Sequence, residues 1–179
     1  KVFYCVSLDQ VGPKAEYTRA GQTWNTVFNN LCWIRDNFEH SYDKGVIIQP
    51  NPTISVLNIL DLRHIINFLF ENNIPTDYDI NLSNLLVGPE WLSITILPDH
   101  LKKLAKESLE LLKDDLNNYK MYPDRKQFII SGIDNIINYM YNEDNSHEIP
   151  KFRQEMQKLD MKRNENFLQV FPELKDLYV

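Results

Sequence analysis

The sequence is poor in cysteine and glycine and lacks several familiar enzyme motifs, and each shortage excludes a class of protein. Two cysteines, Cys5 and Cys32, among 179 residues are too few for a disulfide framework or for a cluster of metal-binding thiolates, and we expect both to be small buried thiols. The four histidines are too scattered to form a metal site. Phosphate-binding loops, nucleophile elbows and metalloprotease helix motifs are absent, which disfavours an ordinary hydrolase or nucleotide-binding domain.

Positive charge and long apolar runs are also scarce. The 19 Lys and Arg residues face 25 Asp and Glu residues, which gives a formal net charge of −6. Proteins that bind nucleic acid usually carry a basic stripe, so a phosphate backbone is disfavoured as a partner. No apolar run is long enough to span a bilayer, and Lys1-Val2-Phe3 has no signal-peptide pattern. We therefore expect a soluble, cytoplasmic protein that binds neither nucleic acid nor a membrane.

The first 88 residues contain an alternation of apolar runs and amphipathic segments. Short apolar runs at residues 2–6 and 46–48, and an alternating run at residues 77–86, predict three strands. Apolar residues at helical spacing predict helices over about 24–37, with Thr23 as N-cap, and over about 56–71. Intervals of about 35 residues between strands are typical of right-handed crossovers, so we predict a parallel βαβαβ sheet.

After Pro89 the pattern predicts helices alone. They are expected from Pro98-Asp99, from Pro123 and from about Pro150. We interpret the charged face of the last helix as a solvated surface. The chain is thus predicted to contain a βαβαβ segment, residues 1–88, and an α-helical C-terminal region, residues 89–179.

Polar side chains follow the predicted strands. Ser7 and Asp9 end the first strand and Arg19 lies in the loop after it, where a hydroxyl and a guanidinium could bind a carboxylate or a ribose. In the structural alternative, Ser7 and Asp9 cap the loop and Arg19 pairs with Glu16 at the surface. Uncharged groups that could touch a ligand or satisfy loop amides follow the second strand and run along the third: Gln49, Asn51, Asn81, Ser83 and Asn84.

Taken in order, several of these segments resemble a known family. Val6-Ser7-Leu8-Asp9, followed by Glu16-Tyr17-x-Arg19-x-Gly21-x-x-Trp24, resembles the fourth βα unit of radical S-adenosylmethionine (radical SAM) enzymes, most closely those with a C-terminal twitch domain. Residues 53–62 resemble the exit of the fifth strand and the helix after it, and residues 89–94 with Leu97-Pro98 resemble the segment that leaves the sixth strand. The likeness covers about the first 100 residues.

The resemblance implies a fold, cofactors and binding residues. The fold is a partial (β/α)6 barrel, similar to a TIM barrel, of which this chain would supply strands four to six. The complete enzyme would hold S-adenosylmethionine and a [4Fe–4S] cluster and generate a 5′-deoxyadenosyl radical that abstracts hydrogen from a small-molecule or peptide substrate. By the family pattern, Ser7 would bind the ribose or amino-acid moiety of S-adenosylmethionine and Arg19 its carboxylate. Asn51 and Ser55 are candidates for contacts near the adenine or ribose.

Two family motifs are absent from the chain: the CxxxCxxC cluster loop and the glycine-rich second-strand motif. We therefore interpret the chain as the C-terminal half of such an enzyme, from a truncated reading frame and inactive by itself. It would have no catalytic or metal-binding residue of its own and would hold no cofactor alone. The alternative is a non-catalytic α/β module for protein interaction or ligand binding.

The predicted half-barrel leaves one face and one edge of its sheet without cover. Parallel strands are normally buried on both faces, and the strands here are apolar on both. We therefore expect a homodimer that pairs through the exposed face or edge. If the helical tail folds back over the open face, a monomer is expected instead.

Overall fold

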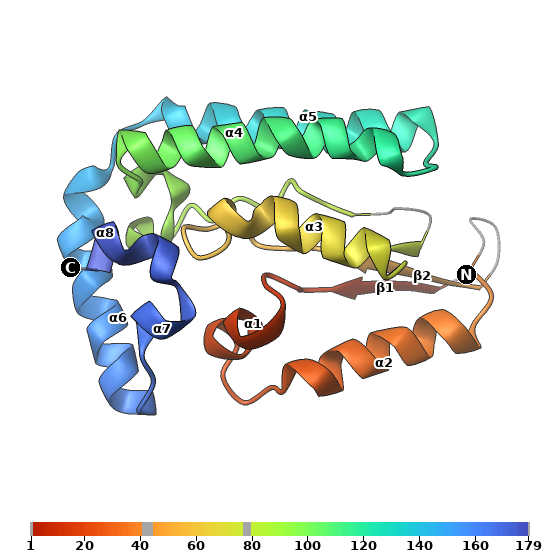
Figure 1. The fold of residues 1–179 in the computed structure, drawn as a ribbon, viewed down its shortest axis with the longest axis horizontal. Coiled ribbons are helices and arrows are strands. Elements are labelled where there is room, and N and C mark those ends of the chain that lie inside the picture. The colour runs from red at the N-terminus through yellow and green to blue at the C-terminus, as the bar shows by residue number, and fades with distance from the viewer. Residues whose placement is uncertain (1, 41–44, 77–79, 179) are drawn as a thin grey trace.

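The computed structural model describes residues 2–40, 45–76 and 80–178, and its α/β fold consists mostly of helices (Figure 1). Within these ranges two strands, β1 (Val2–Val6) and β2 (Val46–Pro50), form a parallel sheet. Helix α2 (Trp24–Asn37) connects them. The predicted parallel order of the first two strands and the bounds of the helix between them are therefore confirmed.

The third predicted strand is the main departure from expectation. Residues 77–79 lie outside the described residues, and residues 80–86 form only an isolated parallel bridge, between Leu85 and Ile54. The segment still follows the exit of β2, because Asn81 N donates to Pro50 O at 3.0 Å. Local bonding interrupts the ladder, since the Asn81 side chain accepts from the amide and hydroxyl of Ser83. A partial TIM barrel stays a prediction.

Helices form close to the other predicted positions. The second predicted helix consists of a 3₁₀ turn, η1 (Ile59–Asp61), that continues into α3 (Leu62–Glu71). The segment after β1, expected as a loop, contains the short helix α1 (Gly12–Thr18), which begins with Pro13 in the favoured first turn. The C-terminal region contains α4 (Asp99–Asp115), α5 (Pro123–Asn142), α6 (Ile149–Arg163), α7 (Phe167–Val170) and α8 (Lys175–Tyr178). Further 3₁₀ turns are η3 (Glu90–Leu92), η4 (Ile94–Ile96), η5 (Leu116–Asn118), η6 (Ser146–Glu148) and η7 (Pro172–Leu174).

The cap of α2 differs from the predicted one. Thr23 precedes the helix, but its side chain makes no capping hydrogen bond. Instead, the Glu16 carboxylate accepts from Trp24 N at 2.8 Å. A carboxylate at this position also interacts favourably with the positive end of the helix dipole, so a residue from α1 takes over the function assigned to Thr23.

Buried apolar residues on both sides of the predicted boundary at residues 88–89 belong to one core. Ile48 of β2 and Ile65 of α3 are fully buried in it, as are Leu109 of α4 and Ile133 of α5. Phe128, five residues before Ile133 on the same helix, is half exposed. The division into two regions stays a prediction.

Strand β1 is far less covered than β2. Val2, Phe3 and Tyr4 are 56%, 49% and 47% exposed, whereas Ile47 and Ile48, which point to opposite faces of β2, are fully buried. Among the described residues β2 is the sole strand neighbour of β1. The expectation of two buried thiols is also wrong, because Cys5 on β1 is exposed and Cys32 on α2 is only partly buried.

The last helices lie beyond the carboxyl ends of the strands, toward which both arrows point in Figure 1. They join the N-terminal part through an aromatic cluster in which the ring of Tyr17 stands edge-on to Phe167 and Phe171, with centroids 5.9 and 5.5 Å apart. The Tyr17 hydroxyl donates to Asp160 Oδ1 at 2.9 Å. The last helices thus pack on α1, the helix that follows β1.

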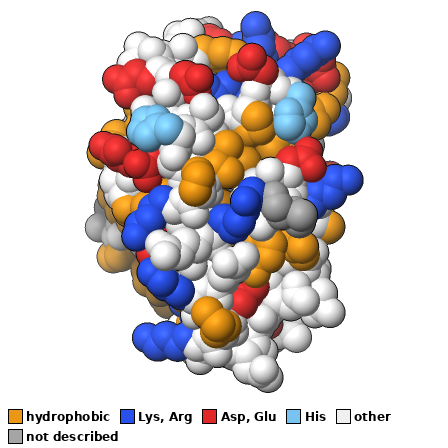
Figure 2. Space-filling view, turned by 90° about the vertical axis from the view of Figure 1, so that its left-hand side faces the viewer, with side chains coloured by type: hydrophobic (Ala, Val, Ile, Leu, Met, Phe, Trp, Pro, Cys, Tyr) orange, Lys and Arg blue, Asp and Glu red, His pale blue; other side chains and the backbone are white. Residues whose placement is uncertain are grey.

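The outer surface of this end carries both signs of charge. Figure 2 shows acidic and basic side chains interspersed with hydrophobic ones over this face. On α6, Lys151 and Lys158 pair with Glu155 at 2.8 and 2.9 Å, as expected for a solvated face. Asp160 departs from that expectation because it faces the aromatic cluster. Across the described part of the chain, none of the helices combines the length and apolar character that crossing a membrane requires.

Candidate functional site

The polar residues at the carboxyl ends of β1 and β2 form a connected cluster. The Asp9 carboxylate receives the Arg19 guanidinium on Oδ2, from Nε at 3.0 Å and Nη2 at 2.7 Å. Its other oxygen accepts from Thr53 N at 2.8 Å. Asp9 therefore links the β1 exit, the end of α1 and the β2 exit. The structural alternative paired Arg19 with Glu16, and this pairing is wrong. Asp9 binds the guanidinium, and Glu16 caps α2.

Asn58 ties the two strand exits together from within the protein. The side chain is 1% exposed, and its Nδ2 donates to Asp9 O at 3.0 Å and to Thr53 O at 2.9 Å. Its Oδ1 accepts from Ser55 N at 2.9 Å. One buried amide thus satisfies three backbone groups that would otherwise lose their hydrogen bonds. This arrangement makes the two exit loops a rigid unit.

A small cavity of about 160 Å3 lies within this cluster. Polar lining comes from Asp9, Thr18, Thr53, Ser55 and Asn58, and apolar lining from Leu57, Leu86 and Leu92. Cavities that enclose a whole cofactor-sized ligand measure roughly 300–1,000 Å3, so this space fits only part of such a ligand.

The four predicted binding residues lie at the same end of the sheet, but they differ in exposure and in their hydrogen bonds. Ser55 is buried and lines the cavity, and its Oγ accepts from Leu57 N at 3.3 Å. Ser7 is exposed, and Arg19 is held by Asp9. Asn51 bonds to β1 through its backbone, with its N donating to Val6 O at 2.8 Å. Its Oδ1 is buried and has no hydrogen-bond partner among the described residues.

The cofactors implied by the family resemblance fit these residues unequally. Among the described residues no group of three or more His, Cys, Asp or Glu side chains could hold a metal ion, so an iron–sulfur cluster does not fit this part of the chain. For S-adenosylmethionine, the orphaned Asn51 Oδ1 is an acceptor for one hydroxyl or amino group, and exposed Ser7 can reach solvent-side groups. Asn51 Oδ1 and Ser7 are therefore polar groups at this end that can still bond to such a ligand.

Sequence reasoning overlooked Asn58 as the centre of the cluster. A signal was present, because Ser55 and Asn58 are the polar residues of the otherwise apolar run from Ile54 to Leu60. Polar residues three apart in such a run are typical of side chain-to-backbone turns. The bond from Asn58 to Asp9, however, crosses 49 residues of sequence and could not be read from spacing.

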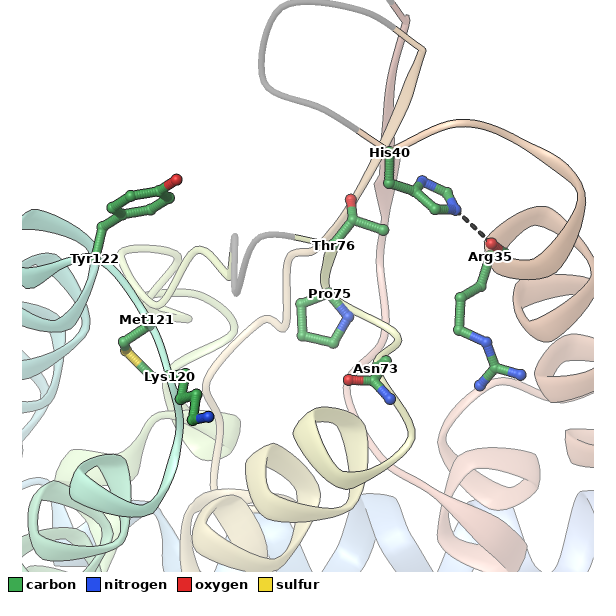
Figure 3. Close-up of a pocket in the computed structure, with 8 residues that line it drawn as sticks. All are labelled: Arg35, His40, Asn73, Pro75, Thr76, Lys120, Met121 and Tyr122. Carbon is green, nitrogen blue, oxygen red and sulfur yellow. Dashed lines mark hydrogen bonds between the residues drawn. The ribbon is translucent and has the colours of Figure 1, made fainter.

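A second cavity, of about 640 Å3, lies at the amino ends of the strands (Figure 3). Two of its polar side chains, those of Arg35 and His40, are held by structural contacts. Arg35 donates to Asp36 at 2.7 Å and to Asn72 O at 2.5 Å. Both ring nitrogens of His40 face backbone carbonyls, Nδ1 at 2.6 Å from Val46 O and Nε2 at 2.5 Å from Arg35 O. Because Arg35 already fastens α2 to the end of α3, and His40 joins α2 to β2, we place the candidate site at the carboxyl end.

Comparison with known proteins adds no relative: no family model matches the chain, and no curated protein or solved structure is significantly similar to it.

Proposed function

We propose that the chain is the C-terminal half of a radical SAM enzyme that acts on a small-molecule or peptide substrate. In this role it supplies three of the six βα units, and the half that carries the cluster-binding cysteines completes the barrel. The cofactor, when bound, supplies the radical chemistry of the family. The residues of this chain bind and orient it, with Ser7, Arg19, Asn51 and Ser55 on its ribose, adenine and carboxylate side.

The observation that carries this proposal is the uncovered strand β1. Parallel strands are normally buried on both faces, yet Val2, Phe3 and Tyr4 alternate between the faces of β1 and remain about half exposed. At roughly 25 cal/mol per Å2, a few hundred Å2 of exposed apolar surface forgoes several kcal/mol. A further parallel strand beside β1, with its helix, would cover this surface.

The polar cluster supports the same proposal. In barrels and open α/β sheets, ligands bind at the carboxyl ends of the strands, which is where the rigid Asp9–Asn58 unit and the buried, unpartnered Asn51 Oδ1 lie. The guanidinium of Arg19 keeps N–H groups beyond those that bind Asp9, because a guanidinium has five. Asp9 thus holds Arg19 in a fixed orientation from which it can still donate to a carboxylate.

The first test is genetic. An in-frame continuation upstream of Lys1 that encodes three closely spaced cysteines in a CxxxCxxC pattern supports the proposal. A stop codon followed by a start site immediately upstream of Lys1 overturns it.

The second test uses the complete protein, reconstituted anaerobically with iron and sulfide. We expect Arg19→Ala to weaken S-adenosylmethionine binding, measured by calorimetry, by about 1.5–3 kcal/mol, the usual contribution of a hydrogen bond to a charged group. Arg35→Ala is the matched control, since Arg35 also pairs with an aspartate but lies at the other end of the sheet. Equal affinities in the two variants would assign Arg19 a purely structural role.

A non-catalytic binding module is the second candidate. It is favoured by the Asp9–Arg19 pair, which is satisfied without any ligand. This candidate predicts that the chain folds alone and that Arg19→Ala lowers its stability without changing S-adenosylmethionine binding in any longer form.

A further inference from the structure

A cavity of about 500 Å3 between α1, α2, α3 and α7 is separate from the proposed cofactor residues. Its size lies within the usual range for a small ligand. Apolar walls come from Val11, Pro13, Trp24, Phe68 and Val170, and polar side chains come from Gln10, Lys14, Asp61, His64 and Gln169. A mostly apolar pocket in which a small number of polar groups converge is typical of a specific binding site.

Two hydrogen-bond acceptors in this cavity have no donor among the described residues. The side chain of Gln10 is 1% exposed, and its Nε2 donates to Leu57 O at 2.8 Å and to Asp61 Oδ2 at 3.2 Å. Lys14 also bonds to Asp61 Oδ2. These bonds use Gln10 Nε2 and Asp61 Oδ2, and no described residue donates to Gln10 Oε1 or Asp61 Oδ1. Neither oxygen is among the fully buried atoms that lack a partner, so both are accessible from the cavity and can accept from a ligand that donates.

The charges of the site favour a cation. Lys14 binds both Asp61 and Glu173, the latter at 2.6 Å, so the three side chains carry a net charge of −1. Burial opposes the charge on Lys14, but the hydrogen bonds and negative charges of Asp61 and Glu173 outweigh it and raise the pKa of its ammonium group. Lys14 is thus a fixed structural cation shared by two carboxylates, of which Asp61 lines the cavity and Glu173 lies outside its lining.

The aromatic wall suits a flat cation. The rings of Trp24 and Phe68 lie with centroids 6.0 Å apart, and Phe28 packs against both, at 5.6 and 5.4 Å. Trp is the best aromatic partner for a cation over its face. A guanidinium is planar, stacks on aromatic rings and has forked donors that can reach two acceptors at once.

We propose that this cavity binds a guanidinium group on a short apolar stem, with its N–H groups on Asp61 Oδ1 and Gln10 Oε1 and its plane against Trp24 and Phe68. The stem lies along Val11 and Val170. Both a free alkylguanidine and the arginine side chain of a peptide have this chemistry.

The test uses the full chain and two probes of equal shape, N-butylguanidinium and neutral N-butylurea. Calorimetry should give at least tenfold tighter binding for the guanidinium, and proton–nitrogen NMR should show shifts of the Trp24 indole and Gln10 amide signals. Asp61→Asn should weaken guanidinium binding about tenfold, whereas the matched control Asp176→Asn, an exposed acid outside the cavity, should not. Equal affinity for the two probes, or shifts that map elsewhere, would overturn the proposal.

A second variant covers the case in which Asp61→Asn disturbs the fold by releasing Lys14. Phe68→Leu keeps an apolar wall but removes an aromatic face, so it should weaken binding of the guanidinium several-fold more than that of the urea. An equal effect on both probes contradicts cation recognition. Agmatine and an N-acetylated, amidated arginine then distinguish the two sources. Tighter binding of agmatine indicates a free alkylguanidine, and tighter binding of the capped arginine indicates a peptide side chain. None of these measurements involves S-adenosylmethionine, so their outcome is independent of the proposed enzyme function.

Discussion

Replacing Tyr17 with Phe should destabilise the protein by about 2 kcal/mol, because the change removes one hydrogen bond to a charged acceptor and nothing else. The Tyr17 hydroxyl donates to Asp160 Oδ1 at 2.9 Å, and the residue is 3% exposed. Its ring contacts with Phe167 and Phe171 are unaffected by loss of the hydroxyl. The Asp160 carboxylate retains two donors, Tyr178 Oη at 2.7 Å and Phe167 N at 3.0 Å, so its charge is not left bare.

Asp160→Asn should be more severe. One amide oxygen and two N–H groups would replace two carboxylate oxygens that accept from three donors, which leaves at least one buried donor unpaired. A cost of about 3–5 kcal/mol is expected, a large share of the 5–15 kcal/mol that stabilises a typical domain. Because this contact joins α1 to the last helices, the loss should appear in the global transition rather than as fraying of the chain end.

Thermal and urea unfolding followed by circular dichroism would measure both effects. For a chain of this size, 1 kcal/mol corresponds to roughly 2–4 °C in Tm, so Tyr17→Phe should lower Tm by about 4–8 °C. Tyr122→Phe is the matched control, since Tyr122 is 72% exposed and should change stability by less than about 0.5 kcal/mol. If Tyr17→Phe and Tyr122→Phe have the same Tm, the reasoning from the Asp160 contact is refuted.

Tyrosine titration provides an independent measurement of the same cluster. Burial, and then the hydrogen bond and charge of Asp160, raise the pKa of Tyr178 to about 12. The folded state therefore favours the neutral phenol, and this stabilisation is present below the ordinary tyrosine pKa of about 10 and is lost as the pH rises through about 12. In Asp160→Asn the ultraviolet titration of Tyr178 should move back toward about 10.

Three further predictions concern other parts of the molecule. Sedimentation equilibrium should show a dimer that covers β1, and a single species near the chain mass of 21.2 kDa would contradict it. Asn58→Ala should cost about 2–4 kcal/mol in urea unfolding because three buried backbone groups lose their partner, whereas exposed Asn138→Ala should cost almost nothing. The hydrogen bond from Arg63 lowers the pKa of Asp115, so Asp115→Asn should reduce stability at neutral pH. The difference in stability between this variant and the native chain should vanish as the pH falls below that lowered pKa. A difference that does not change with pH would show that the charge of Asp115 is not its cause.

Elements whose signals are local could be predicted from the amino-acid sequence. Apolar spacing placed α2 at residues 24–37, and proline marked the beginnings of α4 and α5. The β-branched run Val46-Ile47-Ile48 indicated a buried strand, and its pairing with β1 followed from the interval between the two runs. These features depend on backbone preferences and on which side chains leave water, and both are properties of neighbouring residues.

The choice of partners for the polar groups, in contrast, depends on how the whole chain packs. Asp9 rather than Glu16 binds Arg19, Glu16 rather than Thr23 caps α2, and Asp160 bonds to Tyr17 across 143 residues of sequence. A carboxylate can pair with any donor within reach, so composition and spacing leave many pairings equally open. Packing of the apolar core removes this freedom, because it brings particular donors and acceptors together and buries them, and a buried polar group without a partner is costly.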